Sequence, residues 1–143
     1  AFRLASELGL LLIVPDTSPR GEGVPDRETD EIGSGAGFYL DATQAPWATH
    51  YRMETYITDE LYQLAIKELP VDPKRIGLFG HSMGGHGALT LFLRHPGLYK
   101  SLSAFAPICA PTQSKWGATT FAEYLGHNEA AWKEHDACEL LRA

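Results

Sequence analysis

The chain has 143 residues, of which 44% are hydrophobic and 21% charged, a composition typical of one soluble globular domain. Its formal net charge of -6 argues against nucleic acid or an anionic membrane as a partner, because binding to either depends on a basic surface. The longest apolar run covers residues 8–15 and is far too short to cross a bilayer, which takes about 20 residues.

The N-terminal part of the chain predicts a helix, a strand and a long loop. Residues 2–8 place apolar side chains at helical spacing, and residues 10–14 form a continuous apolar run typical of a buried strand. Residues 16–36 are rich in proline, glycine and charged side chains and show little periodicity. Loops of that length are often functional, and we expect Asp16 and Arg20 to organise this one rather than to contact a substrate.

The middle of the chain predicts an aromatic segment and then an amphipathic helix. Residues 38–52 carry Tyr39, Trp47 and Tyr51 without a regular period, and we expect this segment to pack over a sheet rather than to bind a cofactor. Residues 54–69 favour a helix with an apolar stripe on one side and charged side chains on the other. The stripe consists of Ile57, Leu61, Leu64, Ala65 and Leu69.

Residues 75–87 contain the most informative motif. They read Arg-Ile-Gly-Leu-Phe-Gly-His-Ser-Met-Gly-Gly-His-Gly, so a serine stands between two glycines, after an apolar run at 76–79 and before a helical pattern at 85–95. This arrangement is typical of a nucleophile elbow, in which a sharp turn from strand to helix exposes the central hydroxyl. The motif therefore predicts Ser82 as the nucleophile of a hydrolase.

The neighbours of Ser82 complete this interpretation. Gly80 and Gly84 lack a Cβ atom, which lets the strand and the helix approach each other closely, and His81 fills the remaining position before the serine. The backbone N–H of Met83 opens the helix and points toward the oxygen of any carbonyl that Ser82 attacks. We therefore expect Met83 to supply one half of an oxyanion hole.

The C-terminal part predicts one more strand and several short helices. The strand covers residues 101–106, and a loop containing Trp116 follows it. Helical patterns then cover residues 119–124, 129–135 and 138–142. Strands separated by helices predict parallel strands joined by crossovers, hence a three-layer α/β sandwich with the elbow at the carboxyl end of a strand.

Other glycine-rich chemistries fit the sequence less well. A phosphate-binding P-loop requires Lys-Ser or Lys-Thr after its last glycine, and neither follows residues 80–87. Residues 33–37 resemble the start of a dinucleotide-binding fingerprint, but Phe38 occupies the position of its last glycine and no strand leads into it. We therefore interpret residues 33–37 as part of a loop.

The histidines and cysteines of the chain are not spaced as in known metal-binding motifs. The six histidines include no His-Glu-x-x-His pair, so we expect no metal site. Cys109 and Cys138 are not spaced as Cys-x-x-Cys, and we expect neither a disulfide framework nor a zinc ribbon. A reducing cytoplasm is the expected compartment, with Cys109 a small buried hydrophobic residue.

Four longer stretches match one known family. They are residues 14–21 (Val-Pro-Asp-Thr-Ser-Pro-Arg-Gly), 35–43 (Gly-Ala-Gly-Phe-Tyr-Leu-Asp-Ala-Thr), 79–89 (Phe-Gly-His-Ser-Met-Gly-Gly-His-Gly-Ala-Leu) and 103–109 (Ser-Ala-Phe-Ala-Pro-Ile-Cys). Weaker matches at Trp116-Gly117 and Tyr124-Leu125-Gly126 extend the similarity over nearly the whole chain. On these residues the chain resembles the S-formylglutathione hydrolase family, also called esterase D, within the α/β-hydrolases.

The resemblance implies a reaction and a mechanism. The reaction is hydrolysis of S-formylglutathione to formate and glutathione, the last step of glutathione-dependent formaldehyde detoxification, with side activity on small carboxylic esters. Ser82, activated by a histidine, attacks the formyl carbonyl, and water then hydrolyses the formyl-enzyme. These steps require no metal or organic cofactor.

The resemblance also implies partners. It points to a small-molecule substrate and to a homodimer of the full-length protein. Trp116 is a candidate to line the acyl or glutathione site, and a buried structural tryptophan is the alternative.

Part of the expected catalytic machinery does not appear among these residues. In α/β-hydrolases the triad runs Ser, then Asp or Glu, then His along the chain, each later member after a further strand, and only one predicted strand follows Ser82. We expect His86, inside the predicted helix, to be a packing or surface residue, and His127 and His135 to have no catalytic role. Residues 1–143 are therefore expected to form a single incomplete α/β-hydrolase domain. Its acid and histidine would follow residue 143, and its second oxyanion donor would precede residue 1.

Two consequences follow from this expectation. The strand at residues 10–14 would reach the elbow strand only through an intervening strand before residue 1, so we expect unpaired strand edges, poor solubility and no activity from these 143 residues alone. Two other interpretations stay open. One is a general carboxylesterase or acyltransferase of the same fold, and the other is a catalytically incomplete, non-enzymatic module.

Overall fold

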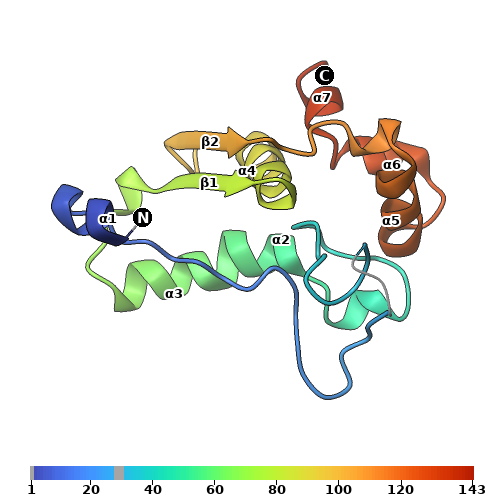
Figure 1. Ribbon diagram of the computed structural model, residues 1–143, viewed down its shortest axis with the longest axis horizontal. Helices are drawn as coiled ribbons and strands as arrows, with labels where there is room; N and C mark the ends of the chain where they lie inside the picture. Colours follow the sequence, from blue (N-terminus) through green and yellow to red (C-terminus); the bar gives the residue numbers. More distant parts are fainter. Residues whose placement is uncertain (1, 28–30) are drawn as a thin grey trace.

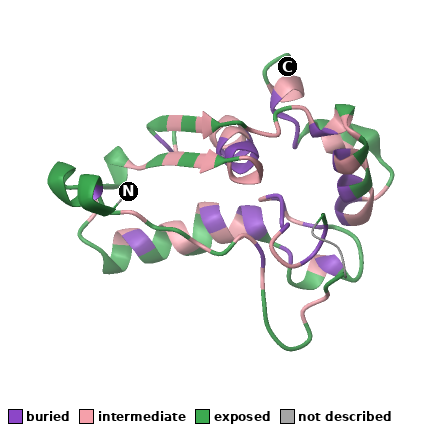
Figure 2. Ribbon diagram, in the orientation of Figure 1, coloured by how far each residue is buried: buried purple, intermediate pink, exposed green. Residues whose placement is uncertain are grey.

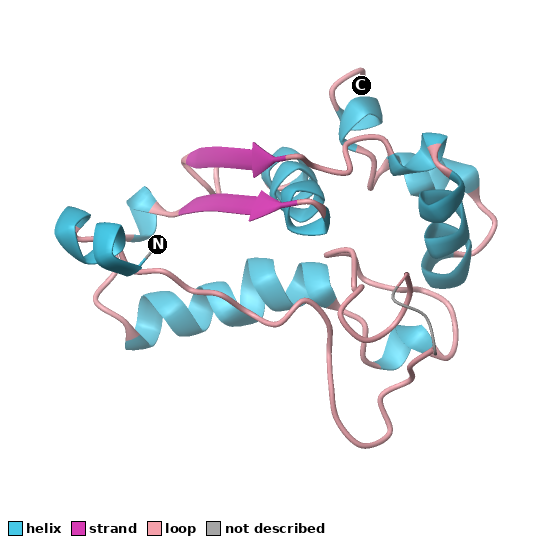
Figure 3. Cartoon of the chain, viewed as in Figure 1, coloured by secondary structure: helices cyan, strands magenta, loops and turns pink. Residues whose placement is uncertain are grey.

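The computed structural model describes residues 2–27 and 31–143. In chain order its elements are α1 (Phe2–Leu8), η1 (Trp47–Thr49), α2 (Met53–Thr55), η2 (Tyr56–Glu60), α3 (Leu61–Glu68), η3 (Pro73–Arg75), β1 (Gly77–His81), α4 (Met83–Arg94), β2 (Ser101–Phe105), η4 (Pro111–Gln113), α5 (Lys115–Leu125), α6 (Glu129–Lys133) and α7 (Ala137–Leu140). Figure 1 shows β1, β2 and α4 together, with α1 toward one end of the molecule and α5 and α6 at the other. Figure 3 shows long loop segments between α1 and α2. Helices around a parallel sheet confirm the predicted α/β class.

The sheet consists of β1 and β2, which pair in parallel. Gly77 lies opposite Ser101 and His81 lies opposite Phe105. Helix α4 connects the two strands and packs against both. Both strands agree with the predicted ones to within one or two residues. The helix begins at Met83, earlier than the sequence pattern indicates, because the glycines at its start adopt helical backbone.

One face of the sheet is open. Phe79 and Phe105 point away from α4 and are 59% and 58% exposed, whereas Leu78 and Leu102, at alternating positions, are partly buried. Figure 2 shows both strands without a fully buried residue. Among the described helices only α4 packs extensively on the strands, so two layers of the predicted three-layer sandwich are present in this part of the chain.

The predicted strand at residues 10–14 does not form, and this prediction is wrong for the isolated chain. The segment has no regular secondary structure, and Leu10, Ile13 and Val14 are 54%, 39% and 75% exposed. A strand takes its hydrogen bonds from a neighbouring strand, and no described residue pairs with this segment. Its apolar character alone is therefore not sufficient to make it a strand.

The predicted helix at residues 54–69 is present as the continuous helical segment α2, η2 and α3. The middle part, η2, is a π-helical turn. Ile57 and Ala65 of the predicted apolar stripe are buried, but Leu64 and Leu69 are 57% and 39% exposed. The stripe is therefore only partly covered by the described residues.

The main core of the chain is a cluster of large side chains, here called the aromatic core. It consists of Ile32, Phe38, Leu40, Ala42, Trp47, Tyr51, Phe121, Tyr124 and Leu125. Tyr51 stacks on Tyr124 with 5.5 Å between ring centroids, and Trp47 meets Tyr124 edge-on at 5.2 Å. Residues 38–52 thus pack against α5 and not over the sheet as predicted, because α5 offers apolar and aromatic side chains that enclose them on several sides.

Hydrogen bonds fix Tyr124 within this core. Its hydroxyl donates to the Ala36 carbonyl and accepts the Gly33 N–H, each at 2.9 Å, while its own carbonyl accepts the Thr43 N–H at 2.8 Å. Burial raises the pKa of Tyr124 above its ordinary value. The buried phenol therefore stays neutral and joins the long loop to α5.

The long loop at residues 16–36 is organised as the sequence predicts, apart from residues 28–30, which lie outside the described residues. The Arg20 guanidinium donates to the Asp16 carboxylate and to the Ser34 hydroxyl, each at 2.6 Å. The Arg20 side chain beside Asp16 holds the pKa of that carboxyl below its usual value.

The C-terminal helices differ from the predicted boundaries. Helix α5 begins at Lys115 because the Ser114 hydroxyl accepts the Gly117 N–H at 3.0 Å and caps the helix. Trp116 therefore lies in the first turn of a helix, and its predicted place in a loop is wrong. None of the helices in the described part of the chain combines the length and the apolar character needed to cross a membrane.

Candidate active site

Ser82 lies at the turn from β1 into α4. Its backbone angles, φ 55° and ψ -116°, fall in a region that residues other than glycine rarely adopt. Its N–H donates to the Phe105 carbonyl at 3.0 Å, and its carbonyl accepts the N–H groups of His86 at 3.0 Å and Ile108 at 3.3 Å. These three bonds hold the strained turn, which has the backbone geometry that a nucleophile elbow requires.

The glycines around Ser82 have different steric surroundings. A Cβ atom on Gly80 would lie 2.1 Å from the Gly84 carbonyl oxygen, so the approach of strand to helix requires glycine there. A Cβ on Gly84 would meet nothing nearer than the Tyr39 hydroxyl at 4.0 Å. The space requirement predicted for both glycines therefore applies to Gly80 only. Two later glycines are also tight: a Cβ on Gly87 would lie 2.3 Å from the Tyr39 ring, and a Cβ on Gly85 would lie 3.0 Å from the Pro107 Cβ.

Met83 places its N–H group beside Ser82. The first N–H groups of a helix have no partner within the helix, and no backbone acceptor for this one occurs in the described ranges 2–27 and 31–143. The positive end of the helix dipole lies at the same place, which favours a negative oxygen there. His81, by contrast, is exposed at the end of β1. The geometry thus leaves the Met83 N–H available to a developing oxyanion.

His86 is completely buried and contacts Ile108. Its Nδ1 atom lies 3.1 Å from the Ile108 carbonyl oxygen, and burial lowers the pKa of the ring to about 4. The ring is therefore neutral near pH 7, and its Nδ1–H donates to that carbonyl. His86 is the packing residue that the sequence predicts. The hydrogen bond from His86 to Ile108, in the segment that follows β2 and contacts Ser82, could not be predicted from the sequence.

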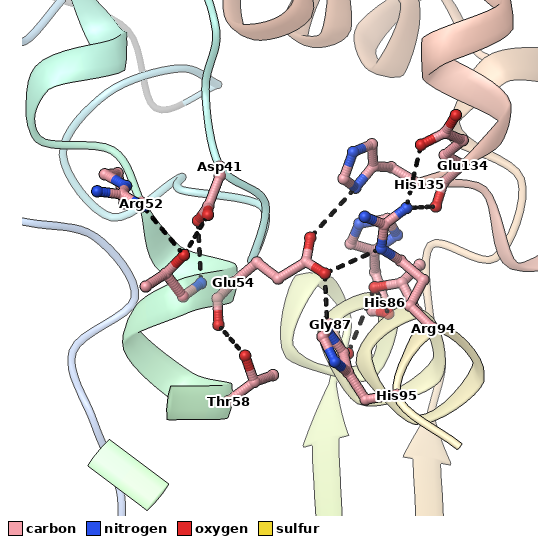
Figure 4. Close-up of polar contacts among 12 residues, drawn as sticks. Asp41, Arg52, Glu54, Thr58, His86, Gly87, Arg94, His95, Glu134 and His135 are labelled. Atoms are coloured by element: carbon pink, nitrogen blue, oxygen red, sulfur yellow. Dashed lines mark hydrogen bonds and ion pairs between the residues drawn. The ribbon is translucent and has the colours of Figure 1, made fainter. Parts of the chain in front are cut away.

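Two other histidines belong to a polar cluster around Glu54, shown in Figure 4 and here called the Glu54 cluster (Glu54, Arg94, His95, Glu134 and His135). The Glu54 Oε1 atom lies 2.8 Å from His95 Nε2 and 3.0 Å from Arg94 Nε. Its Oε2 atom lies 4.0 Å from His135 Nδ1. Burial, and then the Arg94 charge, lower the pKa of His135 to about 4.

These contacts assign the histidines that follow Ser82 to packing or to the surface. His86 bonds to Ile108, His95 and His135 face Glu54, and His127 is exposed. In the part of the chain that the structure describes, no side chain forms a hydrogen bond with the Ser82 hydroxyl. A cavity of about 380 Å³ borders the Glu54 cluster and does not reach Ser82. The described residues therefore bring no general base to Ser82.

Trp116 and Phe38 meet beside the segment that precedes α2. The Trp116 ring lies edge-on to Phe38 at 5.2 Å, and its indole N–H donates to the Glu31 carbonyl at 3.2 Å. Trp116 remains partly exposed. Phe38 in turn lies 5.5 Å from the His86 ring, so packing contacts connect Trp116 to the helix that follows Ser82.

The sequence offers Asp136 only as one of several acids after Ser82, so its structural role was not predicted, and Cys109 was misplaced. Asp136 is fully buried and accepts hydrogen bonds from the Thr112 hydroxyl at 2.6 Å and from the Cys138 N–H at 2.9 Å. An aspartate directly before a short helical run is a common N-cap signal, so the sequence did contain a clue. Cys109 is exposed and not buried as expected, because it follows β2 on a segment that runs along the surface.

Comparison with known families covers the whole chain. A family model described as "Putative esterase" matches residues 1–143. An S-formylglutathione hydrolase of Paracoccus denitrificans (strain Pd 1222) is 56% identical over 138 residues, which are 96% of this chain and 50% of the relative. The S-formylglutathione hydrolase of Mus musculus is 53% identical over 140 residues, which are 97% of this chain and 50% of the relative. The chain thus spans about half the length of these relatives.

Solved structures give the same picture. An S-formylglutathione hydrolase from Agrobacterium tumefaciens superposes with a TM-score of 0.94 at 53% identity, over 97% of this chain and 50% of that one. Mycobacterium tuberculosis MPT51 (FbpC1) superposes with a TM-score of 0.59 at 20% identity, over 73% of this chain and 43% of that one, which indicates a shared fold only. The predicted α/β-hydrolase fold and the predicted resemblance are both confirmed.

Proposed function

This chain belongs to the esterase family, and on that premise we propose that it carries the nucleophile of a serine hydrolase that cleaves S-formylglutathione. The observation that carries the proposal is Ser82 itself, held at positive φ between a parallel strand and the first turn of a helix. The named relatives at 52% to 56% identity support the choice of substrate. The reaction is proposed to complete the conversion of formaldehyde, as its glutathione adduct, to formate.

In the proposed mechanism Ser82 forms a covalent intermediate. Its Oγ atom gives up a proton to a histidine and attacks the formyl carbonyl carbon. The carbonyl oxygen becomes an oxyanion that accepts the Met83 N–H. The C–S bond then breaks, and glutathione leaves as a thiolate that takes up a proton. Water attacks the formyl ester and releases formate, which restores the Ser82 hydroxyl. Because a thiolate is a good leaving group, positioning and oxyanion stabilisation contribute most of the catalysis.

The histidine and its acid partner are proposed to lie beyond residue 143, and the second oxyanion donor before residue 1. This agrees with the absence of a base near Ser82 among the described residues and with the coverage of about half of each relative. Residues 1–143 are accordingly proposed to form one incomplete domain. They are expected to have no activity when produced alone.

Trp116 is the proposed substrate-contacting side chain. It is partly exposed, and its contacts to Phe38 and Glu31 fix the ring in one orientation. A fixed and partly exposed indole offers an apolar surface to an acyl group or to the glutathione chain. The proposal predicts that Trp116→Ala raises KM more than it lowers kcat.

We also propose a cytoplasmic protein that acts on small molecules and not on nucleic acid. The net charge of -6 disfavours binding to phosphate backbones. The homodimer implied by the family resemblance is proposed for the full-length protein.

The test compares substrates with the full-length gene product. We expect kcat/KM for S-formylglutathione to exceed that for p-nitrophenyl acetate by at least about 100-fold, since binding energy from the glutathione part lowers the barrier. Equal values would favour a general carboxylesterase. Failure of Ser82 to react with a fluorophosphonate would instead favour the non-enzymatic interpretation, because an unactivated serine does not react.

A further inference from the structure

Cys109 and Cys138, separated by 28 residues in the sequence, meet after β2. The Cys138 N–H donates to the Cys109 carbonyl at 3.2 Å. This bond brings the main chains of the two cysteines into direct contact, as a disulfide requires, since disulfides join residues whose Cα atoms are about 4.4–6.8 Å apart. Burial raises the pKa of the Cys138 thiol, and the two thiols lie close enough for the Cys109 side chain to raise it further. Both residues are free thiols in this structure.

Neighbouring hydrogen bonds hold the two cysteines in place. The Asp136 carboxylate, which is fully buried, accepts the N–H and the hydroxyl of Thr112 at 3.1 and 2.6 Å. The other oxygen of the same carboxylate accepts the Cys138 N–H at 2.9 Å. Asp136 therefore ties the segment that carries Cys109 to the helix that carries Cys138. Once one of the two cysteines is in a mixed disulfide, a second thiol that the fold holds close displaces it much faster than a dissolved thiol does.

The two thiols differ in reactivity. Cys109 is exposed, whereas Cys138 is only partly accessible. Burial, and then the adjacent Cys109 thiol, raise the pKa of the Cys138 thiol. Less Cys138 is therefore ionised at neutral pH, and Cys109 is the side chain that meets a dissolved oxidant first. In the described ranges no group of three or more His, Cys, Asp or Glu side chains is arranged so that it could hold a metal ion, so the pair is not part of a recognisable metal site.

We propose that Cys109 and Cys138 form a reversible intramolecular disulfide by exchange with a small dissolved disulfide such as oxidised glutathione. The Cys109 thiol loses its proton to water, and the thiolate attacks one sulfur of oxidised glutathione. The S–S bond of glutathione breaks, and one glutathione leaves as a thiolate. The Cys138 thiolate then attacks the Cys109 sulfur and displaces the second glutathione. Two cysteine thiols are oxidised, and one oxidised glutathione is reduced to two molecules of glutathione.

The proposed site responds to the redox state of its surroundings. In a reducing compartment an accessible disulfide is reduced by glutathione, so the pair is expected to be in the thiol form at rest and to oxidise only when oxidised glutathione accumulates. The proposal does not depend on the reaction of Ser82, because none of these steps involves the elbow.

The experiment uses oxidised glutathione as the probe, on the full-length gene product and two variants. After incubation, alkylation and peptide mass spectrometry, the wild-type protein is expected to show a Cys109–Cys138 cross-link that dithiothreitol reverses. The Cys138→Ser variant is expected to accumulate one glutathionyl group on Cys109. The Cys109→Ser variant is expected to be modified at Cys138 at least about tenfold more slowly than the wild type forms its cross-link.

Other results would overturn the proposal. It is wrong if the wild type retains a glutathionyl group on Cys109, as the Cys138→Ser variant does, or if Cys109 stays a free thiol throughout. Circular dichroism and the urea midpoint of each reduced variant show whether it is folded. The variants Cys109→Ala and Cys138→Ala replace any serine variant that is not folded.

Discussion

The sheet that carries Ser82 and the aromatic core enclose the same type of side chain to very different degrees. Phe79 and Phe105 on the sheet are 59% and 58% exposed, whereas Phe38 and Phe121 in the aromatic core are 0% exposed. Figure 2 shows this contrast, with buried positions on α5 and none on the strands. The difference teaches that the part of this chain with the chemistry is not the part that stabilises its fold.

The two regions also differ in how their geometry arises. The strand, the turn and the helix of the elbow follow one another within residues 77–94, and two backbone hydrogen bonds that join Ser82 to Phe105 and Ile108 complete the turn. The aromatic core brings residues 32–51 against residues 121–125 and depends on long-range contacts. Substitution of Ser82 should therefore affect reactivity, and substitutions in the aromatic core should affect stability.

Ser82→Ala is expected to have the largest effect and to act on reactivity alone. We expect S-formylglutathione hydrolysis by the full-length protein to fall by roughly 10³-fold or more, because no other group can form the acyl intermediate. The urea midpoint should stay unchanged. Ser103→Ala, on the exposed side of β2, is the matched control and should leave kcat/KM as it is. A Ser82→Ala protein with more than a tenth of the wild-type activity would refute the assignment of the nucleophile.

The same substitution, Phe to Ala, can be made at Phe121 in the aromatic core and at Phe79 on the sheet. Comparing the two variants measures how much each region contributes to the free energy of unfolding. Removing the fully buried Phe121 ring should lower the free energy of unfolding by about 3–5 kcal/mol, because lost burial and a new cavity both destabilise the fold. Removing the exposed Phe79 ring from residues 1–143 should cost under about 1 kcal/mol. Urea unfolding followed by tryptophan fluorescence gives both values. Equal losses would mean that the sheet stabilises this chain as much as the aromatic core does.

Acidification tests two buried histidines in different parts of the molecule. His86 lies beside the elbow, and His135 lies in the Glu54 cluster. Burial lowers the pKa of each from 6.5 to about 4, so the unfolded chain binds protons that the folded chain does not. Stability is therefore complete above about pH 6.5 and is lost as the pH falls toward 4, by roughly 3 kcal/mol for each residue.

The measurement compares urea unfolding at pH 7.5 and pH 4.5. His86→Asn and His135→Asn should each reduce the acid-induced loss of stability, while His127→Asn, at an exposed position, should not change it. The asparagine at 86 retains a donor for the Ile108 carbonyl, so that the change in titration is separated from the loss of the hydrogen bond. An unchanged pH dependence in both buried variants would contradict the predicted pKa values.

Gly80→Ala and Gly84→Ala compare two positions within the elbow and are expected to have the smallest effects. At Gly80 the new Cβ would collide with the Gly84 carbonyl, and the loss of stability should be about 1–3 kcal/mol, with weaker fluorophosphonate labelling of Ser82. At Gly84 there is room, and alanine favours a helix, so stability should rise by up to about 1 kcal/mol. A similar loss at both positions would mean that the turn requires glycine on both sides of Ser82.

Local patterns gave correct predictions where neighbouring residues decide the structure. The elbow, the strands beside it and the helix at residues 53–68 follow from short-range periodicity and from glycine and proline positions. The strand predicted at residues 10–14 failed because a strand also needs a partner, and none of the described residues supplies one. The prediction that Trp116 lies in a loop was wrong because α5, capped by Ser114, begins earlier than the apolar pattern indicated.

The sequence by itself determined the fold class, the family and the position of Ser82, since the order of strands and helices, the four stretches that match the family and the elbow motif are all local patterns along the chain. Only the tertiary structure decided that residues 38–52 pack on α5, that Glu54 holds His95 and His135, and that Cys109 lies beside Cys138. The physical reason is that these contacts join segments far apart in the sequence. Their partners are selected by packing and by the pairing of buried polar groups in the folded chain, and no local pattern encodes that selection.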